Sequence, residues 1–365
     1  MKIIKVVLSL AFLFFLLPQI TLAQAPPKDE RFEAVVVKVQ EEKQIEINGK
    51  KQLYQKLELR ITSEDSKGKI VIIENGKIPQ VKVQEFKAGD KLVITKSKDE
   101  EGKDVYLIAD FIRRDSLYIL FAIFVGLVIF IGRKRGILSI LGMIISFFII
   151  FTFILPQIMQ GRDPILITVT ASFIIIPLTF YLSHGLNMKT TSAVLGTLIA
   201  LIITGILANV FVDATRLTGF ASEEAGFLEM MRQGAFNMKA LLLSGIIIGV
   251  LGILDDITVS QAAIVYQLKE TSPKLPIQEL YSRAMDVGKD HIASMVNTLV
   301  LVYTGAAMPL LLLFINNKSP FGQVINFEII AEEIVRTLVA STGLILAVPI
   351  TTFITALIVY NKIKL

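Results

Sequence analysis

The chain carries two different hydrophobic patterns. Between residues 26 and 114, apolar and polar residues follow one another in short runs, such as the alternation of Val35, Val37 and Val39 with Val36 and Lys38. A period of two residues is typical of a half-buried β-strand. After residue 115 the apolar runs lengthen to 17 residues or more. Helices of that length cross a hydrocarbon core about 30 Å thick, so the pattern predicts a small β-rich unit followed by membrane helices.

The β-rich unit is punctuated by turn signals. Asn48-Gly49 separates two strand-like runs, and this pair accepts the positive φ angles of a two-residue hairpin. Asn75-Gly76 and Glu101-Gly102 are further turn signals. Strand-like runs occupy residues 35–39, 45–47, 53–61, 70–73, 81–83, 92–95 and 105–109. Several short strands at this spacing favour a small barrel or sandwich.

Seven apolar segments predict about seven transmembrane helices. They are residues 116–132, 137–155, 164–183, 192–211, 240–257, 292–314 and 337–359. Arg133-Lys134-Arg135 follows the first segment, and Lys362 and Lys364 follow the last, which places both positions in the cytoplasm by the positive-inside rule. We therefore expect a mainly α-helical polytopic membrane protein with an extracytoplasmic β-rich domain over 26–114, a transmembrane domain over 116–365 and a cytoplasmic C-terminus.

The first 23 residues are typical of a secretory signal. Lys2 and Lys5 supply the basic head, residues 6–17 are apolar, and Thr21-Leu22-Ala23 provides a small-residue cleavage site. An uncleaved signal anchor is the alternative. In both cases the segment that follows would face outward.

Composition narrows the functional classes. Apolar residues make up 53% of the chain, above the ~45–50% of soluble domains. The net charge of +5 is scattered without a basic-aromatic pattern, so no nucleic-acid partner is expected. The chain has no cysteine, which excludes disulfides and thiolate chemistry. We find no P-loop, dinucleotide fingerprint or H-E-x-x-H motif, so neither an enzyme nor a cofactor is expected. The outer domain has no histidine, and its interleaved charges favour a structural or docking module.

Ionisable groups inside a bilayer are costly, so those near the fifth and sixth segments are the candidate site. Acidic residues end the fifth segment, and an Asp-His pair begins the sixth, followed by a polar stripe at helical spacing. These residues are Asp255, Asp256, Asp290, His291, Ser294, Asn297 and Thr304. Because unsatisfied polar groups in lipid cost several kcal/mol, the stripe is expected to point into the helix bundle.

Three interpretations of these residues remain open. They can form a proton or cation pathway, because carboxylates and imidazoles exchange protons. They can bind a divalent metal, with His184, Asp256, Asp290 and His291 as candidate ligands, although the adjacent Asp255 and Asp256 point about 100° apart on a helix. They can also be structural, at helix ends where the dipole favours a carboxylate. A paired acid and base of an intramembrane protease is conceivable for Asp256 and Asp290, but no second motif supports it.

Other local signals concern the packing and ends of the helices. Gly245, Gly249 and Gly252 share one helix face and predict close packing. Pro309 and Pro349 can kink their helices. The fifth helix is expected to extend beyond the bilayer to Ser272-Pro273, with a second short helix over 276–288. The loop 212–238 can hold a short amphipathic helix at the outer surface.

Two stretches resemble the YibE/F-like membrane proteins of bacteria. They are Gly252–Ala262 (GILDDITVSQA) and Gly288–Leu301 (GKDHIASMVNTLVL), and Tyr303–Pro309 (YTGAAMP) matches as well. The resemblance runs from about Ser116 to the end of the chain. It implies a multi-pass protein of the bacterial plasma membrane and carries over no catalytic residues.

We interpret the chain as a permease or transporter that moves a small solute or ion through a polar pathway between spans five and six. The alternative is a membrane scaffold or sensory subunit whose outer domain binds an envelope or membrane protein partner. In both interpretations the bilayer is the surrounding medium.

Overall fold

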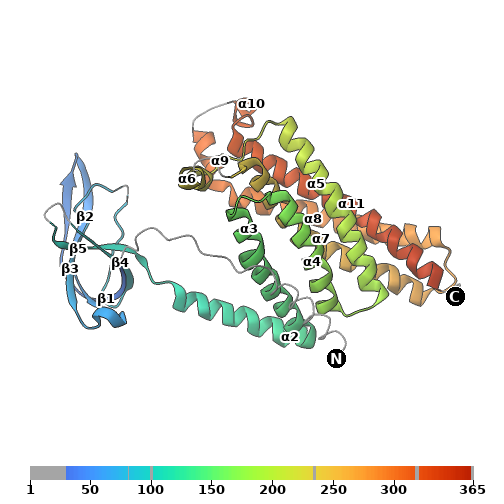
Figure 1. Ribbon diagram of the computed structural model, residues 1–365, viewed down its shortest axis with the longest axis horizontal. Helices are drawn as coiled ribbons and strands as arrows, with labels where there is room; N and C mark the ends of the chain where they lie inside the picture. The colour runs from blue at the N-terminus through green and yellow to red at the C-terminus, as the bar shows by residue number, and fades with distance from the viewer. Residues whose placement is uncertain (1–29, 81, 99–101, 233–235, 317–319, 363–365) are drawn as a thin grey trace. The chain divides into compact units, whose positions relative to one another are not determined.

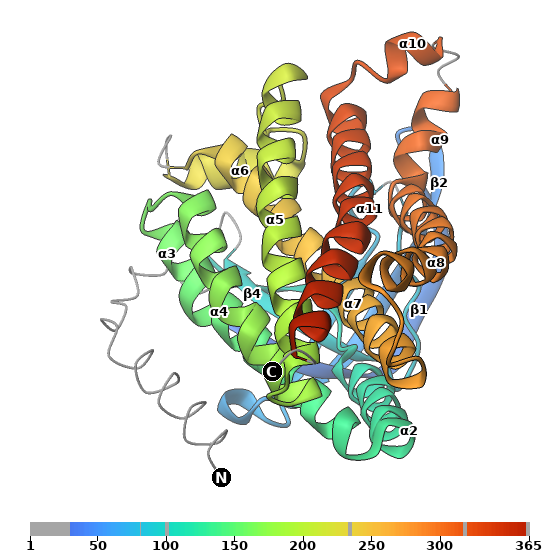
Figure 2. The same ribbon diagram turned by 90° about the vertical axis from the view of Figure 1, so that its right-hand side faces the viewer.

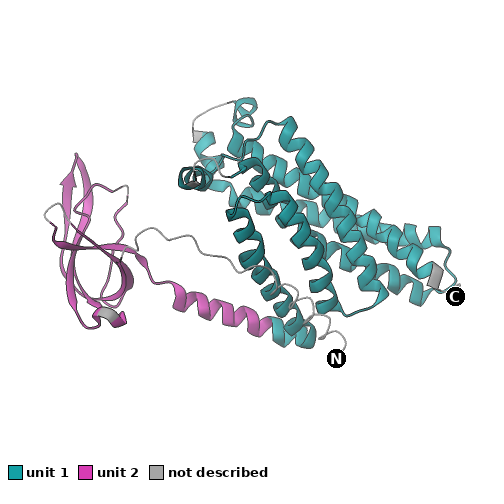
Figure 3. Ribbon diagram, in the orientation of Figure 1, with its two compact units in different colours: residues 1–18, 128–365 teal, residues 19–127 magenta. Residues whose placement is uncertain are grey.

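The structure is a computed structural model that describes residues 30–362, except 81, 99–101, 233–235 and 317–319 (Figure 1). It divides into two compact units, one within residues 19–127 and the other containing residues 128–365 (Figure 3). The predicted signal segment, residues 1–23, lies outside the described residues.

Among its described residues, the first unit has five antiparallel strands. They are β1 (Glu30–Ile47), β2 (Lys50–Ile61), β3 (Ile70–Asn75), β4 (Lys91–Lys98) and β5 (Asp104–Phe111). The strand order is β3-β2-β1-β4-β5, in which β4 returns to lie beside β1 as in a Greek key. The end strands β3 and β5 approach each other, and Lys69 Nζ donates a 3.0 Å hydrogen bond to the Tyr106 hydroxyl on β5. The sheet is therefore a small, partly closed barrel.

The Asn48-Gly49 hairpin is confirmed. Ile47 pairs with Lys50, and the two residues between them have φ angles of 52° and 76°. These positive values give the turn the twist that the flanking strands require. The long β1 also contains two register shifts, between Val36 and Lys38 and between Val39 and Glu41, which bend the strand so that it can pair with both neighbours.

The barrel core follows the alternation of the sequence. Leu57, Leu59 and Ile61 on β2 are buried against Leu92 and Ile94 on β4. At the surface, the Glu74 carboxylate accepts hydrogen bonds from Lys77 Nζ at 2.7 Å and the Tyr54 hydroxyl at 3.1 Å, which hold the pKa of Glu74 below its usual range.

The strand expected over 81–83 is not found at Lys82 and Val83, and residue 81 lies outside the described residues. The connection from β3 to β4 is instead held by side chains. The fully buried Gln55 donates to the Phe86 carbonyl and accepts from the Phe86 amide, at 3.0 and 2.9 Å. Asn75 Nδ2 donates to the Gln84 carbonyl at 2.7 Å. Amide side chains thus replace the backbone ladder that a strand would need.

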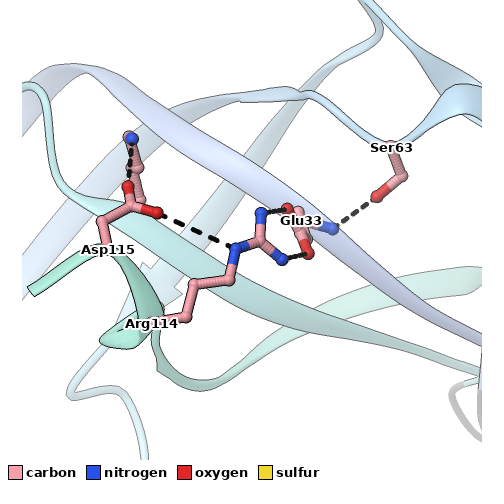
Figure 4. Close-up of polar contacts among 5 residues, drawn as sticks. Glu33, Ser63, Arg114 and Asp115 are labelled. Carbon is pink, nitrogen blue, oxygen red and sulfur yellow. Dashed lines mark hydrogen bonds and ion pairs between the residues drawn. The ribbon is translucent and has the colours of Figure 1, made fainter. Parts of the chain in front are cut away.

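Charged contacts tie the barrel to the helix that follows it (Figure 4). The Arg114 guanidinium donates to both carboxylate oxygens of Glu33 at 2.5 and 2.8 Å, and Lys91 Nζ pairs with Asp115 at 2.6 Å. Ser63 Oγ accepts the Glu33 amide at 2.6 Å. The first turn of the helix is therefore anchored to β1 and β4 by paired charges.

The rest of the described chain is helical. Its elements are α2 (Arg114–Ile149), the π-helical turn η2 (Ile150–Ile154), α3 (Leu155–Met159), α4 (Pro164–His184), α5 (Met188–Ala214), α6 (Glu223–Arg232), α7 (Met238–Thr271), α8 (Ile277–Ala306), α9 (Met308–Asn316), α10 (Phe321–Val324) and α11 (Glu328–Lys362). The helices α5, α7 and α11 pack on one another, with α4 against α7 and α8 against α11 and α7 (Figure 2). A continuous apolar core lies between them.

Polar side chains define several helix starts. Asp163, Asn187 and Asn237 precede α4, α5 and α7, and each accepts the amide three residues later. Such N-caps satisfy amides that have no partner within the helix. As expected, α7 continues to Thr271 and ends before Pro273, and α6 forms within the loop 212–238. The short helix expected over 276–288 is instead the uninterrupted first part of α8.

By length and composition, five described helices could cross a membrane, or six when the bent pair α8–α9 counts as one span. The expectation was seven. The difference lies in the 46-residue segment Arg114–Met159, which covers the first two predicted spans. Its backbone leaves the helical conformation at Arg133, with φ 49° and ψ −129°. In a straight helix, residues 128 and 136 would lie about 12 Å apart. Here they are in contact, because a Cβ added at Gly136 would overlap the Val128 carbonyl. The chain therefore turns back at the predicted basic turn.

Candidate functional site

The polar stripe of α8 faces away from the helices of the chain. Asp290, Ser294, Asn297 and Thr304 are all exposed. The opposite face carries Ala284, Gly288 and Leu299, which are buried against the neighbouring helices. The expectation that the stripe points into the bundle is therefore wrong. The reason is that small residues let α8 approach its neighbours closely, and this contact turns the polar face outward.

The other predicted residues are dispersed. Asp256 on α7 and His184 at the end of α4 are exposed, whereas Asp255 and His291 are partly buried. Thr258, one turn beyond Asp255, donates to the Asp255 carbonyl at 3.3 Å. Within the described part of the chain, no group of three or more His, Cys, Asp or Glu side chains lies together in a way that could hold a metal ion. The candidate metal ligands are thus not gathered into one centre.

The glycines predicted to pack tightly are open. A Cβ at Gly245 or Gly252 would meet nothing within 4 Å, and one at Gly249 would lie 3.9 Å from the Tyr303 hydroxyl. Close approach occurs at other glycines instead. A Cβ at Gly288 would lie 2.6 Å from Val348 Cγ1 and 3.1 Å from Gln261 Nε2. The sequence spacing correctly places the three α7 glycines on one face, but the neighbouring helices cover other faces of α7.

A buried polar network joins four helices at the centre of the bundle. Gln261 on α7 is fully buried, and its Nε2 donates to the Ala284 carbonyl on α8 at 2.9 Å and to Thr352 Oγ1 on α11 at 2.7 Å. Thr258 and Thr197 join their hydroxyls at 2.7 Å, which links α7 to α5. Hydrogen bonds of this kind position membrane helices relative to one another.

A second polar region surrounds the break between α8 and α9. The two helices are bent by 68° between Ala306 and Met308. Pro309 has no N–H and cannot donate to the Gly305 carbonyl, as an uninterrupted helix would require. The Ala307 amide still bonds to the Tyr303 carbonyl at 3.0 Å, so the helix is regular up to the break.

A cavity of about 580 Å³ lies beside this break, and we name it the α8–α11 cavity. Its lining residues are Ala221, Ser222, Tyr303, Ala306, Ala307, Pro309, Leu310, Ile329, Glu332, Glu333 and Arg336. A second hollow of about 240 Å³ shares Tyr303, Ala307 and Glu333 with it and is also lined by Thr304. Thr304, at the end of the predicted stripe, therefore belongs to this region.

The charges of the α8–α11 cavity are unequally paired. Arg336 Nη2 lies 2.5 Å from Glu332 Oε1 and 3.8 Å from Glu333 Oε1. The Arg336 Nε is buried without a hydrogen-bond partner among the described residues. One turn earlier, Glu328 accepts the Thr218 amide, the Thr218 hydroxyl and the Gly219 amide at 2.5, 2.7 and 3.0 Å. These bonds fix the start of α11 against the loop that follows α5.

The sequence did not indicate the charged cluster of Glu332, Glu333 and Arg336, because the last predicted span begins only at residue 337. The structure starts α11 at Glu328, so the charged residues occupy its second and third turns. The available signal is the Glu-Glu-x-x-Arg spacing directly before an apolar run, which brings a carboxylate and a guanidinium to one helix face.

Long apolar helices, a bent helix pair and internal polar contacts define a multi-pass membrane protein joined to an N-terminal β-barrel. Comparison with protein families agrees, because the model of the YibE/F-like proteins matches residues 120–361. The chain belongs to this family, and the resemblance of its two long motifs is confirmed. No match is found among curated proteins or among solved structures.

Proposed function

We propose that the chain is a permease of the bacterial plasma membrane that moves a small solute or ion. The observation that carries this proposal is the charged α8–α11 cavity beside the 68° break between α8 and α9. Discontinuous helices form the binding sites of many transporters. Irregular backbone at membrane depth is tolerated where it lines a water-filled cavity or is buried in protein.

The polar stripe of α8 supports a path leading to this cavity. Asp290 and Thr304 are 14 residues apart, which corresponds to about 21 Å along a helix. An exposed row of polar groups on an apolar helix requires water or another protein beside it rather than lipid. In the proposal this face lines an aqueous path from Asp290 to the hollow shared by Thr304 and Glu333. The path thus runs along the outer face of α8, with Asp256 and the open glycine face of α7 as further candidates for its lining.

The proposed orientation follows from the basic turn. Arg133-Lys134-Arg135 would lie in the cytoplasm, the barrel outside and the C-terminus inside. Under this orientation the α8–α11 cavity opens near the outer surface and Asp290 lies near the inner one. No catalytic role and no cofactor enters the proposal.

A scaffold or sensory role is the second candidate, and the contacts in Figure 4 favour it. The two-point contact between Arg114 and Glu33 holds the first turn of α2 to the barrel. A partner bound to the barrel could thereby act directly on the first membrane helix, because bidentate pairs fix orientation as well as distance.

Flux measurements separate the two roles. The purified chain is reconstituted in sealed liposomes with pH- and metal-sensitive dyes, and ion and pH gradients are applied. Flux should be present, should be lost in Asp290→Asn, and should persist in the control Asp286→Asn, which lies one turn earlier and is exposed. Both variants must insert and fold like the parent. Undiminished flux in Asp290→Asn contradicts the proposed path. A cellular phenotype that tolerates Asp290→Asn but is lost on removal of residues 26–114 supports the scaffold.

A further inference from the structure

The α8–α11 cavity has the size of a small-molecule site. Its volume of about 580 Å³ lies within the ~300–1,000 Å³ of typical ligand pockets. Ala306, Ala307 and Pro309 supply an apolar wall, and the charged residues of α11 lie on another side. This combination accommodates a ligand with an apolar body and one charged group.

The charged side chains of the cavity indicate that the charged group of the ligand is positive. Arg336 is held 2.5 Å from Glu332, so one positive and one negative charge largely cancel. Glu333 lies 3.8 Å from the same nitrogen, beyond hydrogen-bond distance, and lines both hollows. Two carboxylates thus share one guanidinium, and the cavity carries one excess negative charge, with Glu333 the more weakly paired carboxylate. The C-terminal end of α8 adds partial negative charge at the break, because its last carbonyls face the end of the helix.

Tyr303 indicates which chemical class of ligand the cavity favours. Tyr303 lines both hollows, and aromatic faces attract alkylated ammonium groups, which remain positively charged but are weakly hydrated. A divalent metal is disfavoured, because no cluster of three or more metal-binding side chains occurs among the described residues. Resting on the proposed permease function, we propose that the α8–α11 cavity binds a small organic ammonium ion through Glu333 and Tyr303, as the outer site of the pathway.

The test uses the full chain purified in lipid nanodiscs, with tetramethylammonium chloride as the probe and titration calorimetry as the readout. Saturable binding should be absent with sodium chloride or sodium acetate. Glu333→Gln should weaken tetramethylammonium binding about tenfold or more, because the neutral amide removes the excess negative charge of the cavity. Tyr303→Leu should weaken it as well. Glu223 is an exposed residue of α6 outside the cavity lining, so Glu223→Gln is the matched control and should leave binding unchanged.

Each outcome decides between named alternatives. Binding of tetramethylammonium that fails to saturate, or that is unchanged in Glu333→Gln, overturns the inference. Saturable acetate binding that is lost in Arg336→Gln also overturns it, because the cavity would then select an anion. If Glu333→Gln unfolds, Tyr303→Leu carries the same test with the charges intact. Flux of another solute without tetramethylammonium binding refutes this site while the permease proposal stands. If tetramethylammonium binds but no solute flux is observed, the binding site is supported and the permease proposal is refuted.

Discussion

Replacing Gly343 with alanine measures how closely α5 and α11 approach each other. A Cβ at Gly343 would lie 2.8 Å from Thr204 Cγ2 and still closer to Thr204 Oγ1, inside the 3.0 Å that real Cβ contacts keep. Thr204 is itself buried and donates its hydroxyl to the Ala200 carbonyl at 2.7 Å, so its side chain cannot easily rotate away. The added methyl group must therefore push the two helices apart or displace that hydroxyl.

The expected cost follows from two opposing effects. Inserting a methyl group into a packed core costs about 1–3 kcal/mol. Alanine also favours the helix over glycine by about 1 kcal/mol, which reduces the net loss. The difference of the two terms is about 0–2 kcal/mol, so we expect Gly343→Ala to destabilise the protein by up to about 2 kcal/mol. A second change, Thr204→Ala, should recover part of this loss because it removes both crowding atoms beyond Cβ.

The matched control is Gly245→Ala on α7, where an added Cβ would meet nothing within 4 Å. This variant should be neutral or up to about 1 kcal/mol more stable, because only the helix preference changes. Unfolding in mixed micelles, followed by circular dichroism, gives both free energies. Equal destabilisation by the two substitutions would refute the reasoning, since it would mean that the glycine face of α7 is as tightly covered as that of α11.

Four further outcomes are expected. The chain has no cysteine, so Lys134→Cys introduces a single thiol, which should react with a membrane-impermeant thiol reagent only after cells are permeabilised. A thiol that does not react either before or after permeabilisation would mean that one unbroken span crosses the bilayer at Arg133. Gln261→Ala and Thr352→Val should show a coupling of about 0.6 kcal/mol in a double-mutant cycle; additive effects would argue against their hydrogen bond. Leu59→Ala should cost about 2–5 kcal/mol in denaturant unfolding, because this side chain is fully buried in the barrel. Because the pKa of Glu74 is lowered from its usual value of 4.5, its carboxylate stabilises the folded barrel at any pH above 4.5, and this contribution is lost as the pH falls below that value. The difference in unfolding free energy between the parent and Glu74→Gln should therefore shrink on acidification, and a difference that grows would contradict this.

Local patterns were sufficient for the elements of the barrel. The Asn48-Gly49 turn depends only on two residues that accept positive φ, and the structure has both. The interval 81–83 could not be assigned in the same way. Its surroundings depend on Gln55 and Asn75, side chains that are distant in sequence and that bind the connection in place of a strand.

In the helical unit, the sequence located the apolar segments and some of the helix ends, because hydropathy and proline act within a few residues. It predicted the end of α7 before Pro273 and the basic turn at Arg133. It could not decide which helix face is covered, since that depends on the neighbours chosen in three dimensions. The stripe from Asp290 to Thr304 was therefore placed correctly along α8 but on the wrong side of it.

The sequence by itself determined the two-part organisation, the family and the polar groups of α8, because composition, periodicity and long motifs are properties of the chain alone. Pro309 indicated a kink in the sixth predicted span, but only the tertiary structure revealed the α8–α11 cavity beside the break and the unequal pairing of Arg336 with Glu332 and Glu333. The physical reason is that a cavity and its net charge depend on distances between separate helices. Packing at Gly288 and Gly343 sets those distances, and neither residue has a side chain from which its contacts could be predicted.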